Sequence, residues 1–214
     1  MRQHQVRPGP PAGDGADFSA IFGEQGITVL LAASTHSPEE PLILDAFLAL
    51  RKEFPALRLV LVPRHAERGN DIEKMIRDRG LRYHRRSNDT GDKQGFAVLL
   101  ADTTGELARL IKGADLVIMG KTLAGNDEGQ NIIEPAVMGQ PVICGRQLKN
   151  FRQALDALVK GDAVLRVMKD DELVGALRSL LADPAKRREL GERARAVMQK
   201  SRGALEKILA EIIK

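Results

Sequence analysis

Three polar segments follow apolar runs in this sequence, and their side chains are of kinds that bind phosphate and ribose. The segments are Ser34–His36, Pro63–His65 and Thr103–Gly105. The apolar runs predict parallel strands, so the three segments are expected at one sheet edge, where open α/β folds bind their ligands. Arg64 follows a proline that stiffens the turn, and its guanidinium could clamp a phosphate with two hydrogen bonds. An exposed arginine paired with Glu67 is the alternative.

The segment after Ala101 predicts a helix that starts directly at a strand end. Thr103 and Glu106 have the spacing of a capping box, and a helix from Thr104 to Lys112 would carry Gly105 at its second position. A helix N-terminus offers free backbone N–H groups and a partial positive charge, which suit a phosphate. A plain cap without a ligand is equally compatible with this spacing.

The stretch from 115 to 145 predicts a β-α-β unit around which the rest is organised. Its first strand ends at Gly120, a polar loop and a helix follow, and a second short strand ends at Cys144. Asn131 and Glu134 have cap-and-box spacing. Glu134 therefore has two candidate roles: tying down the helix start, or accepting hydrogen bonds from ribose hydroxyls.

These segments need a sheet to hold them, and the alternation of strands and helices predicts one. The pattern is typical of an α/β fold with a Rossmann-like, doubly wound parallel sheet. Ser37 and Glu40 predict a capping box at the first helix. Residues 1–26, rich in Pro and Gly, predict a flexible tail or linker, and 27–214 a single domain. The predicted strands are 27–33, 57–62, 81–84, 96–101, 116–119, 142–144 and 163–167, with 85–95 as a polar loop. The predicted helices are 37–54, 67–79, 104–112, one between 131 and 141, 151–159, 171–181, one from 184, and 204–213.

Composition excludes several function classes. Only 3% of the 214 residues are aromatic and none is Trp, so the stacking platforms of nucleic-acid binders are not expected. The four histidines lack metal-ligand spacing, and neither GxGxxG after the first strand nor a Walker lysine motif occurs. We therefore expect no metal and no cofactor. Cys144, the single cysteine, fits a reducing cytoplasm, and an inert core thiol is favoured over a nucleophile.

The chain is expected to be cytoplasmic, because no apolar run approaches the ~18 residues of a membrane span. A basic segment from Lys186 to Arg202 could still touch an anionic surface, such as the inner membrane. Glu189 and Glu192 interrupt it, which favours a solvated helix face.

The ordered set of motifs resembles the 3-deoxy-D-manno-octulosonic acid (Kdo) transferases, glycosyltransferases of the GT-B architecture. Each motif is short, but their order covers nearly everything after residue 26. The matching segments are AASTH (32–36), LVPRHAER (61–68), DTTGEL (102–107), the Gly120 loop, NIIEPAVMGQPVICG (131–145), NFRQAL (150–155) and SRGAL (201–205).

The resemblance implies a single GT-B half-domain with a site for the donor CMP-Kdo, used in lipopolysaccharide biosynthesis. By analogy Pro63 and Arg64 hold the nucleotide, and Asn131 and Glu134 bind phosphate or ribose. Thr104 and the segment Gly105, Glu106 and Leu107 would frame the phosphate and base. The family usually has Met at Thr104, a second Gly at Lys121 and His at Gln130. Lys121 either strengthens phosphate binding or fills space that glycine leaves open.

The family's other half, which holds the acceptor surface and the catalytic base, has no counterpart in this sequence. The resemblance therefore implies a domain that binds donor without completing transfer, either as a subunit with an acceptor-domain partner protein or as half of a longer enzyme. Two alternatives stay open. One is a non-enzymatic nucleotide-binding or regulatory module, and the other is half of a GT-B enzyme that uses another nucleotide sugar.

Overall fold

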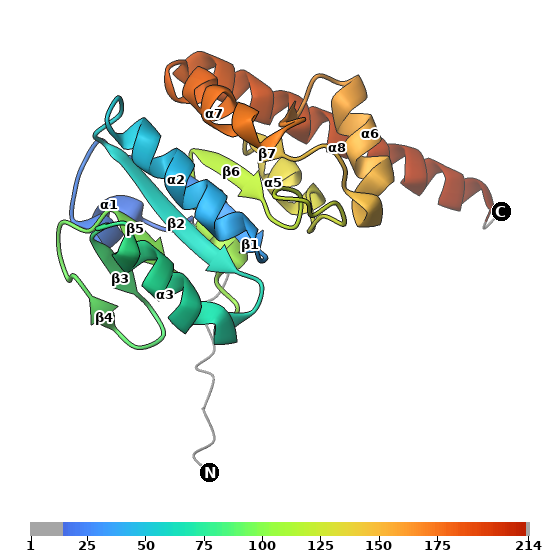
Figure 1. The fold of residues 1–214 in the computed structure, drawn as a ribbon. Coiled ribbons are helices and arrows are strands. Elements are labelled where there is room, and N and C mark those ends of the chain that lie inside the picture. Colours follow the sequence, from blue (N-terminus) through green and yellow to red (C-terminus); the bar gives the residue numbers. More distant parts are fainter. Residues whose placement is uncertain (1–14, 213–214) are drawn as a thin grey trace, which may run out of the picture.

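A mostly parallel sheet forms the centre of the computed structural model, which describes residues 15–212, with side chains through Ser201 (Figure 1). The eight strands lie in the order β4-β3-β5-β2-β1-β6-β7-β8, and only β3 and β4 pair antiparallel. This confirms the predicted Rossmann-like fold. The strands are β1 (Thr28–Thr35), β2 (Leu57–Pro63), β3 (Tyr83–Arg85), β4 (Thr90–Gly91), β5 (Val98–Leu100), β6 (Leu116–Met119), β7 (Val142–Cys144) and β8 (Leu165–Arg166).

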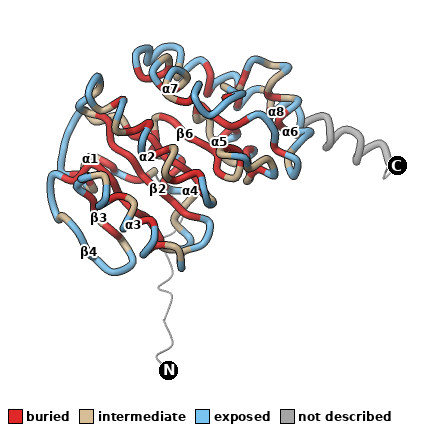
Figure 2. Tube along the Cα trace, viewed as in Figure 1, coloured by how far each residue is buried: buried red, intermediate tan, exposed pale blue. Residues whose placement is uncertain are grey.

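Helices cover both faces of the sheet, and the central strands between them are buried, whereas β4 at the edge is exposed (Figure 2). Strand β2 is buried along its whole length, including Arg58, the one charged residue in its otherwise apolar sequence. A nearly continuous apolar sequence is typical of a parallel strand that is covered on both faces. Helices α2 (Glu39–Arg51), α3 (Gly69–Asp78) and α7 (Leu173–Leu181) pack on one face. On the other face lie α1 (Phe18–Phe22), α4 (Leu107–Gly113), α5 (Ile133–Met138) and α6 (Arg152–Lys160). Short 3-10 turns are η1 (Ala66–Arg68), η2 (Lys149–Phe151) and η3 (Asp170–Glu172).

The expectation of a tail through residue 26 is wrong for residues 15–26. Phe18 and Phe22 of α1 are buried, and the Phe22 ring lies 4.9 Å from that of Phe96, centroid to centroid. Asp17 caps the helix by accepting the Ala20 N–H. Two phenylalanines at i and i+4 thus add a packed element to a segment whose composition suggests a linker. Residues 1–14, the rest of the predicted tail, lie outside the described residues.

The polarity of segment 85–95 predicts a loop, but the structure shows that part of it is strand. Arg85 ends β3 in a buried position, where its Nε lies 2.7 Å from Asp102 and its Nη1 lies 2.8 Å from Glu73. Thr90 and Gly91 form β4. Arginines are usually exposed, but Arg85 can be buried because Glu73 and Asp102, from two other parts of the chain, neutralise its charge.

The C-terminal segment forms one long helix, α8 (Pro184–Ile212), in place of two. Three of its arginines donate to backbone carbonyls of the protein: Arg187 to Leu180 and Leu181, Arg193 to Asp162, and Arg195 to Met138. The carbonyls of Leu180, Leu181 and Met138 lie in the last turns of α7 and α5, where basic side chains are favourable. Much of the basic character of α8 is therefore used for packing.

Candidate functional site

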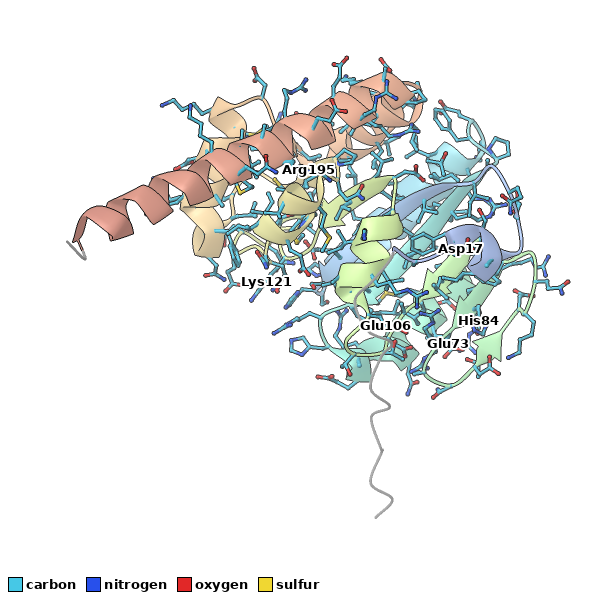
Figure 3. The ribbon with its side chains drawn as sticks, turned by 180° about the vertical axis from the view of Figure 1, so that it is seen from behind. Asp17, Glu73, His84, Glu106, Lys121 and Arg195 are labelled. Carbon is cyan, nitrogen blue, oxygen red and sulfur yellow. The ribbon has the colours of Figure 1, made fainter. Side chains whose placement is uncertain are left out.

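The carboxyl ends of β1, β2, β5 and β6 meet at one edge of the sheet. Thr35 pairs with Pro63, Leu61 with Leu100, and Ala33 with Met119, so these parallel strands end at nearly the same level. All of the site residues predicted from the sequence lie at the ends of these strands or in the segments that follow them. Figure 3 shows Lys121 and Glu106 in the lower part of the view, on the side where these strands end.

A buried carboxylate that the sequence does not reveal organises this edge. Glu39 is fully buried at the start of α2. Its Oε1 accepts the N–H groups of Thr122 and Leu123 at 2.7 and 2.8 Å, and its Oε2 accepts those of His36 and Lys121 at 3.0 and 2.7 Å. Burial raises the pKa of Glu39, while the four N–H donors act in the opposite direction. The loop after β6 is thereby attached to the helix after β1.

The predicted capping box of Ser37 and Glu40 is wrong. Helix α2 begins at Glu39 after Pro38, with no side-chain cap. Glu40 is fully buried and instead forms a two-bond ion pair with Arg68, at 2.6 and 3.0 Å. The spacing of a capping box is present, but the carboxylates of Glu39 and Glu40 both bind groups that are distant in the sequence.

The loop that follows β6 closes on itself. Gly129 and Gln130 donate to the carbonyls of Lys121 and Gly120, which brings the start of α5 back to the end of β6. A Cβ at Gly120 would lie 2.2 Å from the Ser34 carbonyl oxygen, so β1 approaches closely here. Lys121 has a φ of 59°, in the left-handed region that favours glycine. This explains physically why glycine would suit position 121, and the Lys121 ammonium pairs with Glu128.

Thr122 and Gly145 join this loop to the end of β7. The Thr122 hydroxyl donates to the Met119 carbonyl at 2.7 Å and accepts the Gly145 N–H at 2.9 Å. A Cβ at Gly145 would lie 1.7 Å from the Thr122 carbonyl oxygen. Glycine is required here because two backbone segments touch.

Arg64 follows β2 directly and is exposed. The alternative pairing with Glu67 is wrong, because the Glu67 carboxylate lies 3.4 Å from His65. Within residues 15–201, Arg64 forms no side-chain hydrogen bond or ion pair. The rings of His36 and His65 meet edge to face, 5.4 Å apart. Burial lowers the pKa of His36, and Lys121 and His65 act in the same direction, against the Ser34 carbonyl and Glu40.

The helix predicted from Thr104 begins three residues later, at Leu107. Thr104 and Gly105 lie exposed in the preceding loop, and Gly105 has a φ of 85°. Glu106 accepts a hydrogen bond from Thr103 at 2.9 Å and pairs with Arg86 at 2.7 Å. Gly105 is thus not the second residue of a helix, and helix polarity gives no argument for phosphate there. What remains is an exposed loop, and the space beside Gly105 is open, since a Cβ there would meet no atom within 4 Å.

The start of α5 differs from its capping-box prediction. Asn131 accepts the Ile133 N–H at 3.2 Å, but the helix begins at Ile133 and has no side-chain cap. Glu134 is half-buried in the first turn, and in the described part of the chain it has no hydrogen-bond or ion-pair partner. Of its two candidate roles, tying down the helix start is wrong, and its carboxylate is available to a ligand.

The structure therefore places Arg64, Gly105 and Glu134 at one edge, as the sequence predicts. The helices that follow Gly105 and Asn131 pack against each other, since α4 contacts α5. Beside the Lys121 loop lies a cavity of about 230 Å³, between Thr122, Arg146 and Asp170. Among the described residues, no group of His, Cys, Asp or Glu side chains has the arrangement of a metal site.

Sequence and structure comparisons place the chain among known proteins. The family model for glycosyl transferases group 1 matches residues 20–197. The chain is 34% identical to the 3-deoxy-D-manno-octulosonic acid transferases of Haemophilus influenzae and Bordetella pertussis, over 90% and 89% of its length. It spans 45% of the length of each.

A solved structure extends this likeness to the fold. The C-terminal CMP-Kdo binding domain of WaaA from Acinetobacter baumannii superposes with a TM-score of 0.77 at 30% identity. The match covers 85% of this chain and 94% of that domain. The chain therefore belongs to the glycosyl transferases group 1 family, as a homologue of the C-terminal domain of 3-deoxy-D-manno-octulosonic acid transferases.

Proposed function

We propose that this chain binds CMP-Kdo at the carboxyl edge of its sheet and acts as the donor-binding half of a Kdo transferase. The observation that carries the proposal is a pair of side-chain charges, Arg64 and Glu134, that have no partner in the described part of the chain and lie at the carboxyl edge of the sheet. The homologous domain of WaaA is described as a CMP-Kdo binding domain. A guanidinium suits the single phosphate of CMP, and a carboxylate suits ribose hydroxyls.

The remaining predicted residues support the same placement. The exposed loop at Thr104 and Gly105 leaves backbone groups open to the phosphate and base. Glu106 and Leu107 follow it at the start of α4, and Pro63 ends β2 beside Thr35. Gly120 and Lys121 lie in the loop held by Glu39, which keeps that loop in place before a ligand arrives. Preorganisation of this kind lowers the entropic cost of binding.

Sugar transfer also requires an acceptor site and a base, which in GT-B enzymes lie across a cleft from the donor. We infer that they are supplied by a second half, either a partner protein or another part of the same polypeptide. On this view the chain alone binds donor and does not complete transfer, and it acts in lipopolysaccharide biosynthesis in the cytoplasm.

Calorimetric titration with CMP and with UDP tests the donor site. Saturable CMP binding that weakens about tenfold in Arg64→Ala and in Glu134→Ala is expected, since each removes a charge-assisted hydrogen bond. Lys52→Ala and Glu192→Gln are matched controls, because both residues are exposed and lie away from this edge. Absence of saturable binding to either nucleotide, or unchanged CMP affinity in Arg64→Ala, would overturn the proposal. Stronger binding of UDP would instead indicate another nucleotide sugar.

The non-enzymatic alternative rests on the two departures at Lys121 and Gln130. Lys121 brings an ammonium into the loop that Gln130 closes through its backbone N–H. If the double change Lys121→Gly and Gln130→His creates CMP binding that the natural chain lacks, the site has been modified away from donor binding. Equal affinity in both proteins would favour the enzyme half.

Peripheral contact with the inner membrane stays a separate prediction. No helix in the described part of the chain has the length and apolar character needed to cross a bilayer. The exposed basic residues of α8 without a described side-chain or carbonyl contact, such as Arg188 and Lys200, are the groups that an anionic surface would meet. Co-sedimentation with anionic liposomes at low and high salt tests this contact.

A further inference from the structure

A second cavity lies beyond the ends of β7 and β8, outside the donor site proposed above. Its volume is about 420 Å³, within the range of small-molecule sites. Four basic side chains line it together with one acidic side chain and a leucine pair. The charged residues are Arg146, Lys149, Arg152, Arg166 and Asp156.

The three arginines of this pocket are unpaired. Lys149 is neutralised by Asp127 at 2.6 Å. The side chains of Arg146, Arg152 and Arg166 form no hydrogen bond or ion pair with any residue in the described range. By contrast, Arg68 near the same edge is engaged by Glu40. Three guanidinium groups around one hollow repel each other unless an anion lies between them.

The arginines come from three different elements, so their meeting is a product of the fold. Arg146 lies in the loop after β7, Arg152 is the first residue of α6, and Arg166 ends β8, in register with Cys144. The nine-residue helix α6 has no side-chain cap at Phe151, so its positive end adds to the charge at the pocket.

The other walls suit an organic ligand. Leu148 and Leu155 are almost fully buried and form an apolar part of the wall. Asp156 follows Arg152 by one helical turn and places a carboxylate on the same side of α6. A carboxylate repels phosphate but accepts hydrogen bonds from hydroxyl groups. The lining therefore offers groups for an anion and a group for a hydroxyl in the same pocket.

We propose that this pocket binds a phosphorylated polyol, with the phosphate on Arg146, Arg152 and Arg166 and a hydroxyl group on Asp156. A free sugar phosphate and the phosphorylated head group of a lipid share this chemistry. Arg146 also lines the cavity beside Thr122 and Leu123, so an occupant would lie next to the loop that Glu39 holds.

Amide NMR titration of the full chain with inorganic phosphate and with glucose 6-phosphate locates the binding. We expect saturable shifts centred on residues 146–156 and 166, and about tenfold weaker binding in Arg152→Ala and in Arg166→Ala. Lys160→Ala, which removes an exposed charge at the other end of α6, is the matched control and should bind like the natural chain. Asp156→Asn should weaken glucose 6-phosphate more than inorganic phosphate.

The Arg64→Ala variant separates this site from the donor site. It should keep the shifts at 146–156 even though its CMP affinity falls. Flotation with phosphatidylcholine vesicles containing phosphatidic acid distinguishes the two sources: Arg166-dependent flotation indicates a lipid head group, and its absence alongside saturable sugar-phosphate binding indicates a free ligand. Shifts confined to residues 104–107 and 120–134, or unchanged affinity in Arg166→Ala, would overturn the proposal.

Discussion

The Glu39 carboxylate accepts the Thr122 N–H at 2.7 Å, although 83 residues separate the two in the sequence. This bond belongs to a set of four that joins the start of α2 to the loop after β6. Because Lys121 in that loop has left-handed backbone, local preferences alone would favour another conformation. A buried long-range contact therefore determines the shape of the edge where we propose the donor site.

Replacing Glu39 by Gln should destabilise the protein strongly. A glutamine offers one carbonyl oxygen where the carboxylate offers two, and its NH₂ group would face N–H donors. We expect a loss of about 3 kcal/mol in the free energy of unfolding, measured by urea denaturation, and weaker CMP binding. Glu67→Gln, at an exposed site, is the control and should change stability little. A stability within about 0.5 kcal/mol of the natural chain would contradict the role given to Glu39.

Gly145→Ala should be poorly tolerated, because its Cβ would lie 1.7 Å from the Thr122 carbonyl oxygen. Both groups are backbone, so neither can move away cheaply, and we expect a loss of about 2–3 kcal/mol. Gly175→Ala is the matched control. Its site in α7 has no neighbour within 4 Å, and alanine should raise stability there by up to about 1 kcal/mol. Thermal unfolding tests this: Gly145→Ala should melt at a lower temperature than Gly175→Ala. Equal melting temperatures of the two variants would contradict the prediction.

Phe22→Ala should show that residues 15–26 belong to the folded domain. The side chain is 2% exposed and packs on Phe18 and Phe96. Truncation removes buried ring area and leaves a cavity, with an expected loss of about 3–5 kcal/mol in urea denaturation. Gln25→Ala, at an exposed position beside α1, serves as the control. If both variants were as stable as the natural chain, α1 would contribute nothing to the core.

Stability should fall as the pH drops from about 7.5 to 5.5. Burial lowers the pKa of both His36 and His84, so the folded state keeps their neutral forms. The unfolded chain takes up protons near its ordinary pKa of about 6.5. The contribution to stability is therefore complete above that pH and is lost as the pH falls through the folded-state values. Urea midpoints at the two pH values measure the effect.

The double variant His36→Gln and His84→Gln should show a weaker pH dependence over the same range. The groups that act on His36 are Lys121, His65 and Glu40, and those that act on His84 are Asp89, Lys93 and Arg86. An unchanged difference between the two urea midpoints would mean that other groups carry the dependence.

Cys144 should not react with a thiol reagent in the folded protein. The side chain is fully buried, and burial raises its pKa to about 12, so the thiolate is scarce near neutral pH. Ellman's reagent should modify it only after denaturation, with one thiol per chain. Rapid native modification would show that the β7 region opens.

The strands and their polar ends were predictable because the signals are local. Apolar runs, interrupted in β2 only by Arg58, mark β1, β2 and β6 as buried on both faces, and parallel pairing then brings their carboxyl ends together. Arg64, Gly105 and Glu134 were found for this reason.

Helix starts were less predictable. The spacing around Thr103 and Ser37 satisfies a capping box, yet partners distant in sequence use Glu39, Glu40 and Glu106.

The sequence by itself determined the α/β architecture, the family and the edge at which a nucleotide is proposed to bind, since each follows from periodicity or from short motifs in order. Only the tertiary structure decided that Glu39 holds the loop after β6, and that Glu134 has no described partner. It also brought three arginines with unpaired side chains, from the loop after β7, from α6 and from β8, around one cavity. These features depend on distances between residues far apart along the chain, and local sequence preferences do not specify such distances.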